Sequence, residues 1–552
     1  MEGRLTAGSE AVMPPGAART RPQTLMDGGA DGPASMVVDA PGGVPIRAPI
    51  GLIVGSTGVR STALTPDGSM AVAIGPDEAV VGVLPPLYPE WLGDRSFGVA
   101  HGCRFSYVVG EMARGIASAD MVIASAKAGF MAFFGSAGLT IPEIDEAILK
   151  IQRALGPTVR NWGANLIHSP QESHMEMDFA ELMLARGVRN ISASAFMRLA
   201  PSVVYLSAKG LRRGQDGAVH RQTHIFAKVS RVEVARPFMS PAPESMLRPL
   251  VESGLLTGEE AQLARLIPVA EDITVEADSG GHTDNRPLPV LLPVIIALAQ
   301  EVSAEHGFAQ PPRVGVGGGL GTPGALASAF AAGAAFVVTG SVNQATVESA
   351  LSEDGRRLLA RASMTDVAMA PAADMFEMGV EVQVLKRGTL FAQRGKELYK
   401  IFRAYPSLEA IPAEERRALE EKVLGRPIDD IWDGTKAFFD ERDPREIERA
   451  RSDPKHKMAL VFRWYLFMGA QWARSGEVGR RADYQIWCGP AMGAFNEWVK
   501  GSFLEPVENR SVVQIGLNLL EGAAHVTRAH QLRLAGVPFG HGGSMFSPRP
   551  LR

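Results

Sequence analysis

Cysteine is scarce in this chain of 552 residues, where Cys103 and Cys488 are the only two and lie far apart. This excludes a disulfide framework and a cysteine-rich metal site, and it favours a reducing cytoplasm. An excess of one charge is also lacking, because 56 basic residues face 60 acidic ones, so nothing indicates nucleic acid as a partner. No uninterrupted apolar run approaches the ~20 residues that cross a bilayer, and the N-terminus lacks the apolar core of a signal peptide. We therefore expect a soluble, cytoplasmic protein without a membrane partner.

The composition is that of a globular protein with a large core, since 46% of the residues are hydrophobic. The length exceeds one ordinary domain, so we expect a barrel with attachments. The expected parts are a Gly-, Ala- and Pro-rich disordered tail (1–44), a small β-rich subdomain (45–103), the barrel (104–395), a helical subdomain that forms a substrate channel or lid (396–505), and a C-terminal helix packing on the barrel (506–552).

β-type runs alternate with helical patterns through the middle of the chain, which is typical of a parallel α/β architecture. The eight strand candidates are residues 105–110, 130–134, 162–168, 190–195, 224–229, 273–279, 313–317 and 336–340. Eight strands close a barrel, so the predicted fold class is α/β, a (β/α)8 TIM barrel. A doubly wound sheet is the alternative that spacing leaves open. The long connection between 229 and 273 is expected to form a lid or wall over the site.

Three strand candidates in order run into glycine-rich ends. The first reads D-I-T-V-E-A-D-S-G-G-H-T-D-N-R-P (272–287), and the others are R-V-G-V-G-G-G-L-G (313–321) and F-V-V-T-G-S-V-N-Q (336–344). Small residues at strand ends before a helix let backbone N–H groups hold a phosphate, which in such barrels often lies after the last two strands. His282 follows the Gly280-Gly281 pair and can donate a hydrogen bond or a proton near neutral pH. The alternative is that His282 only braces the loop after it.

Lys228 stands inside the apolar strand candidate I-F-A-K-V, where an unpaired ammonium is costly, so we expect it to have a partner. Glu276 and Asp278 alternate on one strand face and can point into the barrel, although such carboxylates are as readily structural. His168 and His174 lie near several acidic residues, but their spacing fits no familiar ligand set. We predict no metal site.

The chain resembles the PfaD family, the separately encoded enoyl reductases of polyunsaturated fatty acid synthases and trans-acyltransferase polyketide synthases. Its motifs are G-E-M-A-R-G-I-A-S (110–118), I-F-A-K-V-S-R (225–231), I-T-V-E-A-D-S-G-G-H-T-D-N-R-P (273–287), V-G-V-G-G-G-L-G-T-P (314–323), V-T-G-S-V-N-Q-A (338–345), M-A-P-A-A-D-M-F-E-M-G-V-E-V-Q-V-L-K-R-G-T (369–389) and G-A-F-N-E-W-V-K-G-S (493–502). The resemblance covers about residues 45–551. The barrel is more distantly similar to nitronate monooxygenases and to flavin-dependent bacterial enoyl-acyl-carrier-protein reductases.

The resemblance implies FMN as cofactor, NADPH as reductant and an enoyl thioester on an acyl carrier protein as substrate, within a megasynthase. It implies His282 and Lys228 as catalytic residues, with Asp278 as a secondary candidate. The implied FMN-binding residues are Gly110, Glu111, Met112, Asn165, Ser192, Ser194, Lys228, Gly280, Gly281, Gly317, Gly318, Gly319, Gly340 and Ser341. The rival functions are a nitronate oxidase and a catalytically silent flavin-binding or carrier-docking subunit. A homodimer contact through the Met-rich segment 364–384 is also possible.

Overall fold

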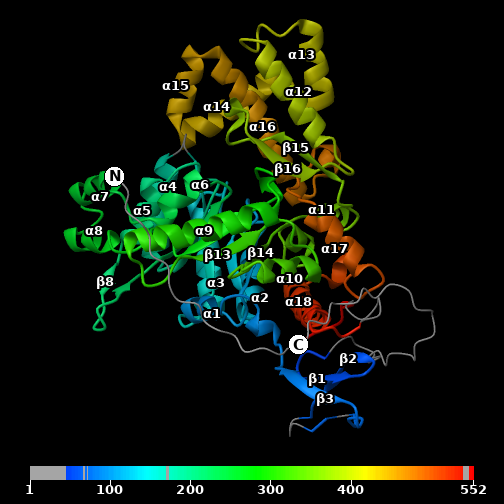
Figure 1. Ribbon diagram of the computed structural model, residues 1–552. Coiled ribbons are helices and arrows are strands. Elements are labelled where there is room, and N and C mark those ends of the chain that lie inside the picture. Colours follow the sequence, from blue (N-terminus) through cyan, green and yellow to red (C-terminus); the bar gives the residue numbers. More distant parts are fainter. Residues whose placement is uncertain (1–44, 66–68, 71, 170–172, 539–545) are drawn as a thin grey trace, which may run out of the picture.

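The structure is a computed structural model that describes residues 45–65, 69–70, 72–169, 173–538 and 546–552. The predicted disordered tail, 1–44, lies outside these residues. At its centre eight parallel strands close into a barrel in the order β10-β11-β13-β14-β4-β5-β6-β7 (Figure 1). The strands are β4 (Tyr107–Val109), β5 (Met131–Phe134), β6 (Trp162–Ile167), β7 (Asn190–Ser194), β10 (His224–Val229), β11 (Asp272–Glu276), β13 (Arg313–Gly317) and β14 (Val337–Thr339). The TIM-barrel prediction is confirmed, and closure excludes the doubly wound alternative.

The amino-terminal end of the barrel is plugged by α1 (Arg95–His101), whose N-cap Asp94 accepts a hydrogen bond from the Ser96 amide. Phe97 of α1 stacks on Phe336 at 4.8 Å inside the barrel. Below it, buried Asp272 accepts hydrogen bonds from Arg313 at 2.7 and 2.8 Å and lies 2.9 Å from His101 Nε2. Because this end is filled, the open end is at the carboxyl ends of the strands.

The barrel is enclosed by helices that follow its strands. They are α2 (Ala119–Lys127), α3 (Ile141–Leu155), α4 (Ser173–Ala185), α5 (Pro201–Ala208), α6 (Val232–Met239), α9 (Leu288–His306) and α10 (Pro323–Ala331), with α11 (Glu353–Leu359) following β14. Within the described residues, α9 alone is long and apolar enough to cross a bilayer by length and composition. It packs against α6, β11 and β13, as a barrel helix does.

The connection after β10 continues from α6 into α7 (Glu244–Glu252) and α8 (Gly258–Ala264), which pack against α5. A short hairpin of β8 (Arg212–Arg213) and β9 (Val219–His220) precedes β10. No residue between 230 and 271 lines the cavity described below. The expectation of a lid or wall in this connection is therefore wrong. Its helices α7 and α8 pack against α5 on the outer side of the barrel instead.

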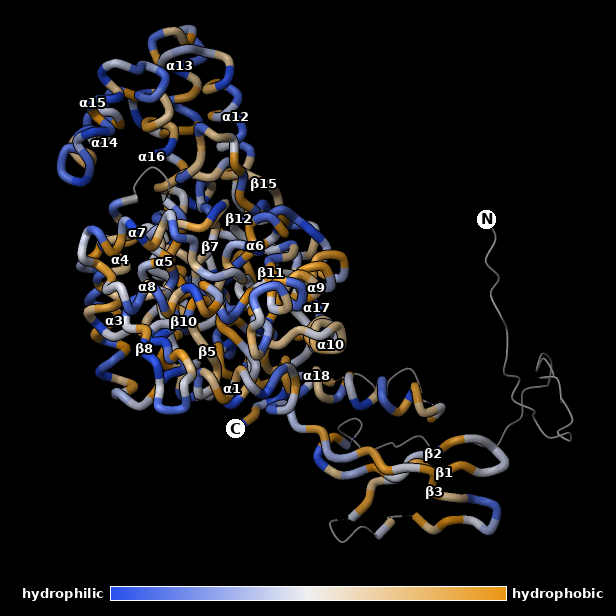
Figure 2. Tube along the Cα trace, turned by 60° about the vertical axis from the view of Figure 1, so that its left-hand side comes forward, coloured by the Kyte–Doolittle hydropathy of each residue, from blue (hydrophilic) through white to orange (hydrophobic). Residues whose placement is uncertain are grey.

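The N-terminal segment forms an antiparallel sheet of β1 (Ile50–Gly55), β2 (Gly58–Ala63) and β3 (Ala79–Leu84) in the order β2-β1-β3. Figures 1 and 2 show this sheet projecting from the barrel at the end opposite the helical region. Ile50 packs on Leu532 of α18 (Val512–Leu534), and α18 in turn packs along α10 and α2. The C-terminal helix thus joins the small sheet to the barrel.

A helical region stands over the carboxyl ends of the barrel strands (Figure 1). It contains α12 (Phe391–Ala404), α13 (Ala413–Leu419), α14 (Ile428–Arg442), α15 (Pro444–Ser452) and α16 (Pro454–Ser475). α17 (Ala491–Val499) lies instead at the side of the barrel, near α10 (Figures 1 and 2). The helical region is connected to the barrel by a second antiparallel sheet, in which β16 (Glu381–Leu385) lies between β15 (Val367–Pro371) and β12 (Gly281–His282). The Met-rich segment 364–384 is thus largely used within the chain, with Met364 and Met378 about half exposed.

Candidate functional site

A cavity of about 630 Å³ lies between the barrel mouth and the helical region. Its lining comes from the carboxyl ends of all eight barrel strands and from α14 and α16. Most implied FMN-binding residues line it, namely Gly110, Glu111, Met112, Asn165, Ser194, Lys228, Gly280, Gly281, Gly317, Gly318, Gly319, Gly340 and Ser341. This is where (β/α)8 enzymes hold their ligands.

The glycines after β13 and β14 form a part of the cavity that has no side chains. Gly318 and Gly319 have φ values of 96° and 71°, which favour glycine, and a Cβ on Gly318 would lie 2.7 Å from the Ala277 carbonyl carbon. A Cβ on Gly319 or Gly340 would meet no atom within 4 Å, although both residues line the cavity. The Ser341 hydroxyl accepts a hydrogen bond from the Gly489 amide at 3.0 Å, which leaves its proton to donate. The cavity thus has open space beside backbone amides and one hydroxyl.

Lys228 lies between two carboxylates at the barrel mouth. Its Nζ is 2.9 Å from Glu276 Oε1 and 3.3 Å from Glu111 Oε1. Burial by itself would lower the pKa of the ammonium, but the two carboxylates outweigh it and raise the pKa, so Lys228 is a cation at neutral pH. Glu111 also accepts a hydrogen bond from the Ser192 hydroxyl at 2.9 Å. Lys228 therefore has two carboxylate partners, where the sequence required at least one.

Asn165 is buried on β6, and its Nδ2 donates to Ser194 Oγ at 2.8 Å and to the Ser192 carbonyl at 3.0 Å. Ser192 and Asp278 do not line the cavity. Ser192 supports Glu111 from behind, whereas Asp278 accepts a hydrogen bond from Gln383 Nε2 at 2.7 Å. The contacts of Asp278 fasten the turn after β11 to β16.

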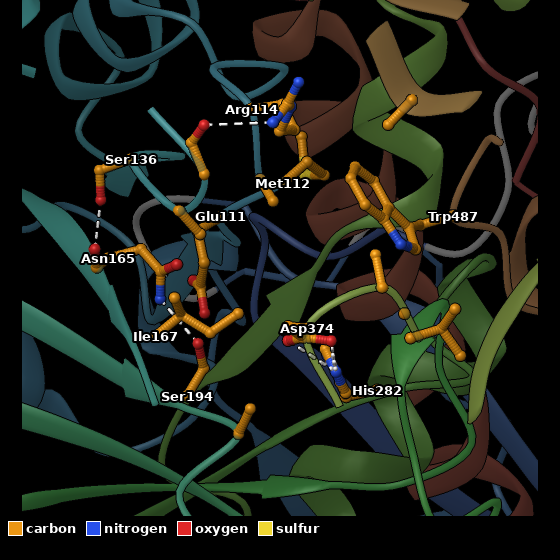
Figure 3. A pocket seen from close by; sticks show the side chains of 18 of the residues that line it. Glu111, Met112, Arg114, Ser136, Asn165, Ile167, Ser194, His282, Asp374 and Trp487 are labelled. Carbon is orange, nitrogen blue, oxygen red and sulfur yellow. Dashed lines mark hydrogen bonds and ion pairs between the residues drawn. The ribbon is translucent and has the colours of Figure 1, made fainter. Parts of the chain in front are cut away.

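His282 forms a pair with Asp374, whose carboxylate lies 3.2 Å from His282 Nε2 (Figure 3). β12 pairs with β16 and so fixes His282, while Asp374 follows β15. Burial would lower the pKa of His282, but Asp374 outweighs it and raises the pKa. The second ring nitrogen, Nδ1, makes no hydrogen bond to a described residue. In this arrangement the Asp374 carboxylate orients the imidazole ring of His282 and favours its protonated form, as expected of a general acid.

Three cavity residues were not named from the sequence: Asp374, Trp487 and Gln344. α14 and α16, which also line the cavity, belong to the segment 396–505 that was expected to form a substrate channel or lid. Gln344 Nε2 donates to the Trp487 carbonyl, and its Oε1 is buried without a partner among the described residues. The motif 338–345 contains Gln344, and Trp487 lies in the segment 396–505 that was expected to form a substrate channel or lid. Nothing local indicates that Asp374 meets His282.

His168 and Glu176 are adjacent, with Nδ1 and Oε1 3.0 Å apart, and Glu176 also accepts a hydrogen bond from Ser202 Oγ at 2.6 Å. These contacts fasten α4 to the loop after β6. Over the described residues, no group of three or more His, Cys, Asp or Glu side chains is arranged to hold a metal ion.

Comparison with known proteins finds relatives over most of the chain. Residues 405–484 match the family described as the inserted helical domain of acyl-carrier-protein S-malonyltransferase. The chain is 48% identical over 451 residues to a polyunsaturated fatty acid synthase subunit of Thraustochytrium sp., covering 80% of this chain and 30% of that protein. It is 44% identical over 435 residues to the polyketide biosynthesis protein PksE of Bacillus subtilis, covering 79% and 56% respectively.

Among solved structures, the enoyl reductase domain of MlnA, from the macrolactin biosynthesis cluster of Bacillus amyloliquefaciens, superposes with a TM-score of 0.77 at 38% identity. The alignment covers 80% of this chain and 99% of that domain. The chain spans only between 22% and 56% of the length of the curated relatives it matches, so those proteins carry other parts as well.

Proposed function

Because this chain belongs to the PfaD family of enoyl reductase domains, we propose that it uses FMN and NADPH to reduce the 2,3 double bond of enoyl thioesters. The thioester is carried by an acyl carrier protein of a polyunsaturated fatty acid or polyketide synthase. The observation that carries the proposal is the cavity, which brings the glycine-lined space, Lys228 and the His282–Asp374 pair together at one barrel mouth.

The residues present fit FMN. Gly317, Gly318, Gly319 and Gly340 would hold its phosphate through backbone N–H groups in the space that a side chain at Gly319 or Gly340 would fill. The Ser341 hydroxyl would donate the further hydrogen bond. When bound, FMN supplies the hydride chemistry that links NADPH to the β-carbon of the enoyl thioester.

Lys228 would provide a fixed positive charge at the pyrimidine edge of FMN. Glu111 and Glu276 hold its ammonium group in place, and Ser192 holds Glu111. A preorganised charge stabilises negative charge that develops during reaction without having to reorient. Glu111 and Glu276 thus act as positioning residues for Lys228.

His282 would deliver the proton that the α-carbon needs. Asp374 engages Nε2 and raises the pKa of the ring, which favours the protonated form that carries a proton on Nδ1. The apolar wall of α14 and α16, including Phe438, Trp464 and Phe467, would receive the acyl chain and exclude water from the reacting carbons.

Anaerobic absorbance spectroscopy of the FMN-loaded protein tests the proposal. We expect a yellow protein that is bleached by NADPH and recovers its colour when crotonyl-pantetheine is added. His282→Gln should still be bleached but should recover its colour at least about tenfold more slowly, since general acid catalysis contributes about 10²–10⁴-fold. Bleached protein that only oxygen recolours, together with oxygen consumption when the oxidised protein is given a nitroalkane, would support the nitronate-oxidase alternative. Protein that binds FMN and is not bleached would support the silent subunit.

A further inference from the structure

The cavity has a second polar region, away from the His282–Asp374 pair. In Figure 3 Arg114 lies on the opposite side of the view from His282. Arg114 and Arg442 both line the cavity, the first from the loop after β4 and the second from the end of α14. Neither is used in the chemistry proposed above.

Arg114 is a buried cation held in a fixed position. Arg114 is only 7% exposed, and its φ of 63° lies in the left-handed region. Its guanidinium lies 3.6 Å from the centre of the Phe467 ring. Its two terminal nitrogens donate to the Gly138 carbonyl at 3.2 Å and to Gln471 Oε1 at 3.4 Å. Its Nε is buried without a hydrogen-bond partner, and no carboxylate of the described residues forms an ion pair with it.

The surroundings of Arg114 add positive charge. Burial lowers the pKa of Arg114 to about 10, and Arg474 and Arg442 contribute in the same direction. Among the described residues, the carboxylate that acts on Arg114 is that of Glu143, which already accepts hydrogen bonds from the Thr140 amide and hydroxyl at 2.8 Å. Since burying an uncompensated charge is costly, such a cation is maintained where an anion completes it.

We propose that Arg114 and Arg442 form a subsite for a phosphate group of the ligands that enter this cavity. This inference rests on the proposed function, in which both ligands, NADPH and the phosphopantetheine arm of a carrier protein, bear phosphate away from the reacting carbon. A planar guanidinium fork suits two phosphate oxygens. One subsite would then serve both ligands in turn, because each must place its reacting carbon at the same mouth.

Binding to the FMN-loaded enzyme tests the subsite without turnover. Phosphopantetheine and pantetheine differ by the phosphate and are titrated separately, with tryptophan fluorescence as the signal, since Trp464 and Trp487 line the cavity. We expect the wild type to bind phosphopantetheine about 10- to 100-fold more tightly, the value of a charge-assisted hydrogen-bonded contact. Arg114→Gln and Arg442→Gln should each remove most of that preference and leave pantetheine affinity within about twofold. Arg153→Gln, an exposed arginine on α3, is the matched control.

A second arm compares NADPH with 1-benzyl-1,4-dihydronicotinamide, which has no phosphate, as reductants of the bound FMN. Loss of phosphate preference in both arms establishes a shared subsite, and loss in one arm assigns it to that ligand. Equal binding of phosphopantetheine and pantetheine by the wild type, together with no Arg114-dependent difference between the two reductants, would overturn the subsite. So would an equal weakening of phosphorylated and phosphate-free ligands by the variants, since that is a structural role.

If Arg114→Gln does not fold, the same titrations of Arg442→Gln test the subsite. Arg442 is only half-buried, so its substitution disturbs the packing less. The subsite and the proposed function can fail separately. A wild type that prefers phosphopantetheine through Arg114 but does not reduce enoyl thioesters retains the subsite and loses the function.

Discussion

Removing the charge of Lys228 should destabilise the barrel mouth, because two carboxylates depend on it. The side chains of Lys228, Glu111 and Glu276 are 16%, 5% and 16% exposed. At an effective dielectric constant of about 20, the distances of 2.9 and 3.3 Å correspond to attractions of about 6 and about 5 kcal/mol. Desolvation of three charges offsets most of this, so the intact cluster contributes little net stability.

The variant Lys228→Met leaves the two carboxylates facing each other without a cation. Breaking a buried pair in this way costs about 3–5 kcal/mol, and we expect a loss of that size in the free energy of unfolding. The measurement is urea denaturation of the FMN-free protein at pH 7, followed by circular dichroism, so that cofactor binding does not enter.

The double variant Lys228→Met, Glu276→Gln is the control. It removes one of the two repelling carboxylates, so it should recover at least about half of the lost stability, which appears as a coupling energy in a double-mutant cycle. A Lys228→Met protein within about 0.5 kcal/mol of wild type would show that these charges are solvated and would refute the reasoning.

Three further predictions concern the proton donor, the phosphate space and the barrel base. Asp374→Asn should lower the pKa of His282, so the alkaline limb of the pH profile of enoyl thioester reduction moves to lower pH; an unmoved limb would exclude His282 as the acid. Gly340→Ala should weaken FMN binding by about 1–3 kcal/mol, measured by fluorescence titration, without lowering the Tm of FMN-free protein, because its Cβ enters open cavity. Asp272→Asn should cost about 3–5 kcal/mol at pH 7 by calorimetry, and a loss under about 1 kcal/mol would contradict this. Since His101 and Arg313 outweigh burial and lower the pKa of Asp272, this contribution is present at neutral pH and is lost as the pH falls through the folded-state pKa.

The barrel could be predicted because each strand has its own local signal. All eight expected strands are present, with ends within three residues of those predicted. The largest error is at β11, which was expected to reach 279 and ends at Glu276. Pairing with β13 stops there because the partner strand ends at Gly317 and turns away at Gly318, with its φ of 96°. The expected alternation of Glu276 and Asp278 therefore fails, since Asp278 lies beyond the strand.

The site residues that lie in sequence motifs were predicted, whereas contacts between segments distant in the sequence were missed. Lys228 required a partner on physical grounds, and the structure provides Glu276 and Glu111. Asp374 is 92 residues from His282 and reaches it through the pairing of β12 with β16. A strand of two residues has no periodicity to detect, so this contact is visible only in the folded chain.

The cavity lining is divided between the barrel and the helical region. The polar groups, from the glycine-lined space to Lys228 and His282, come from the barrel strands and the loops after them, whereas much of the apolar wall comes from α14 and α16. Changes on the faces of α14 and α16 can therefore alter the volume offered to an acyl chain without moving a charged group of the mouth. Under the proposed function, substrate length and reaction chemistry would therefore be set by different residues.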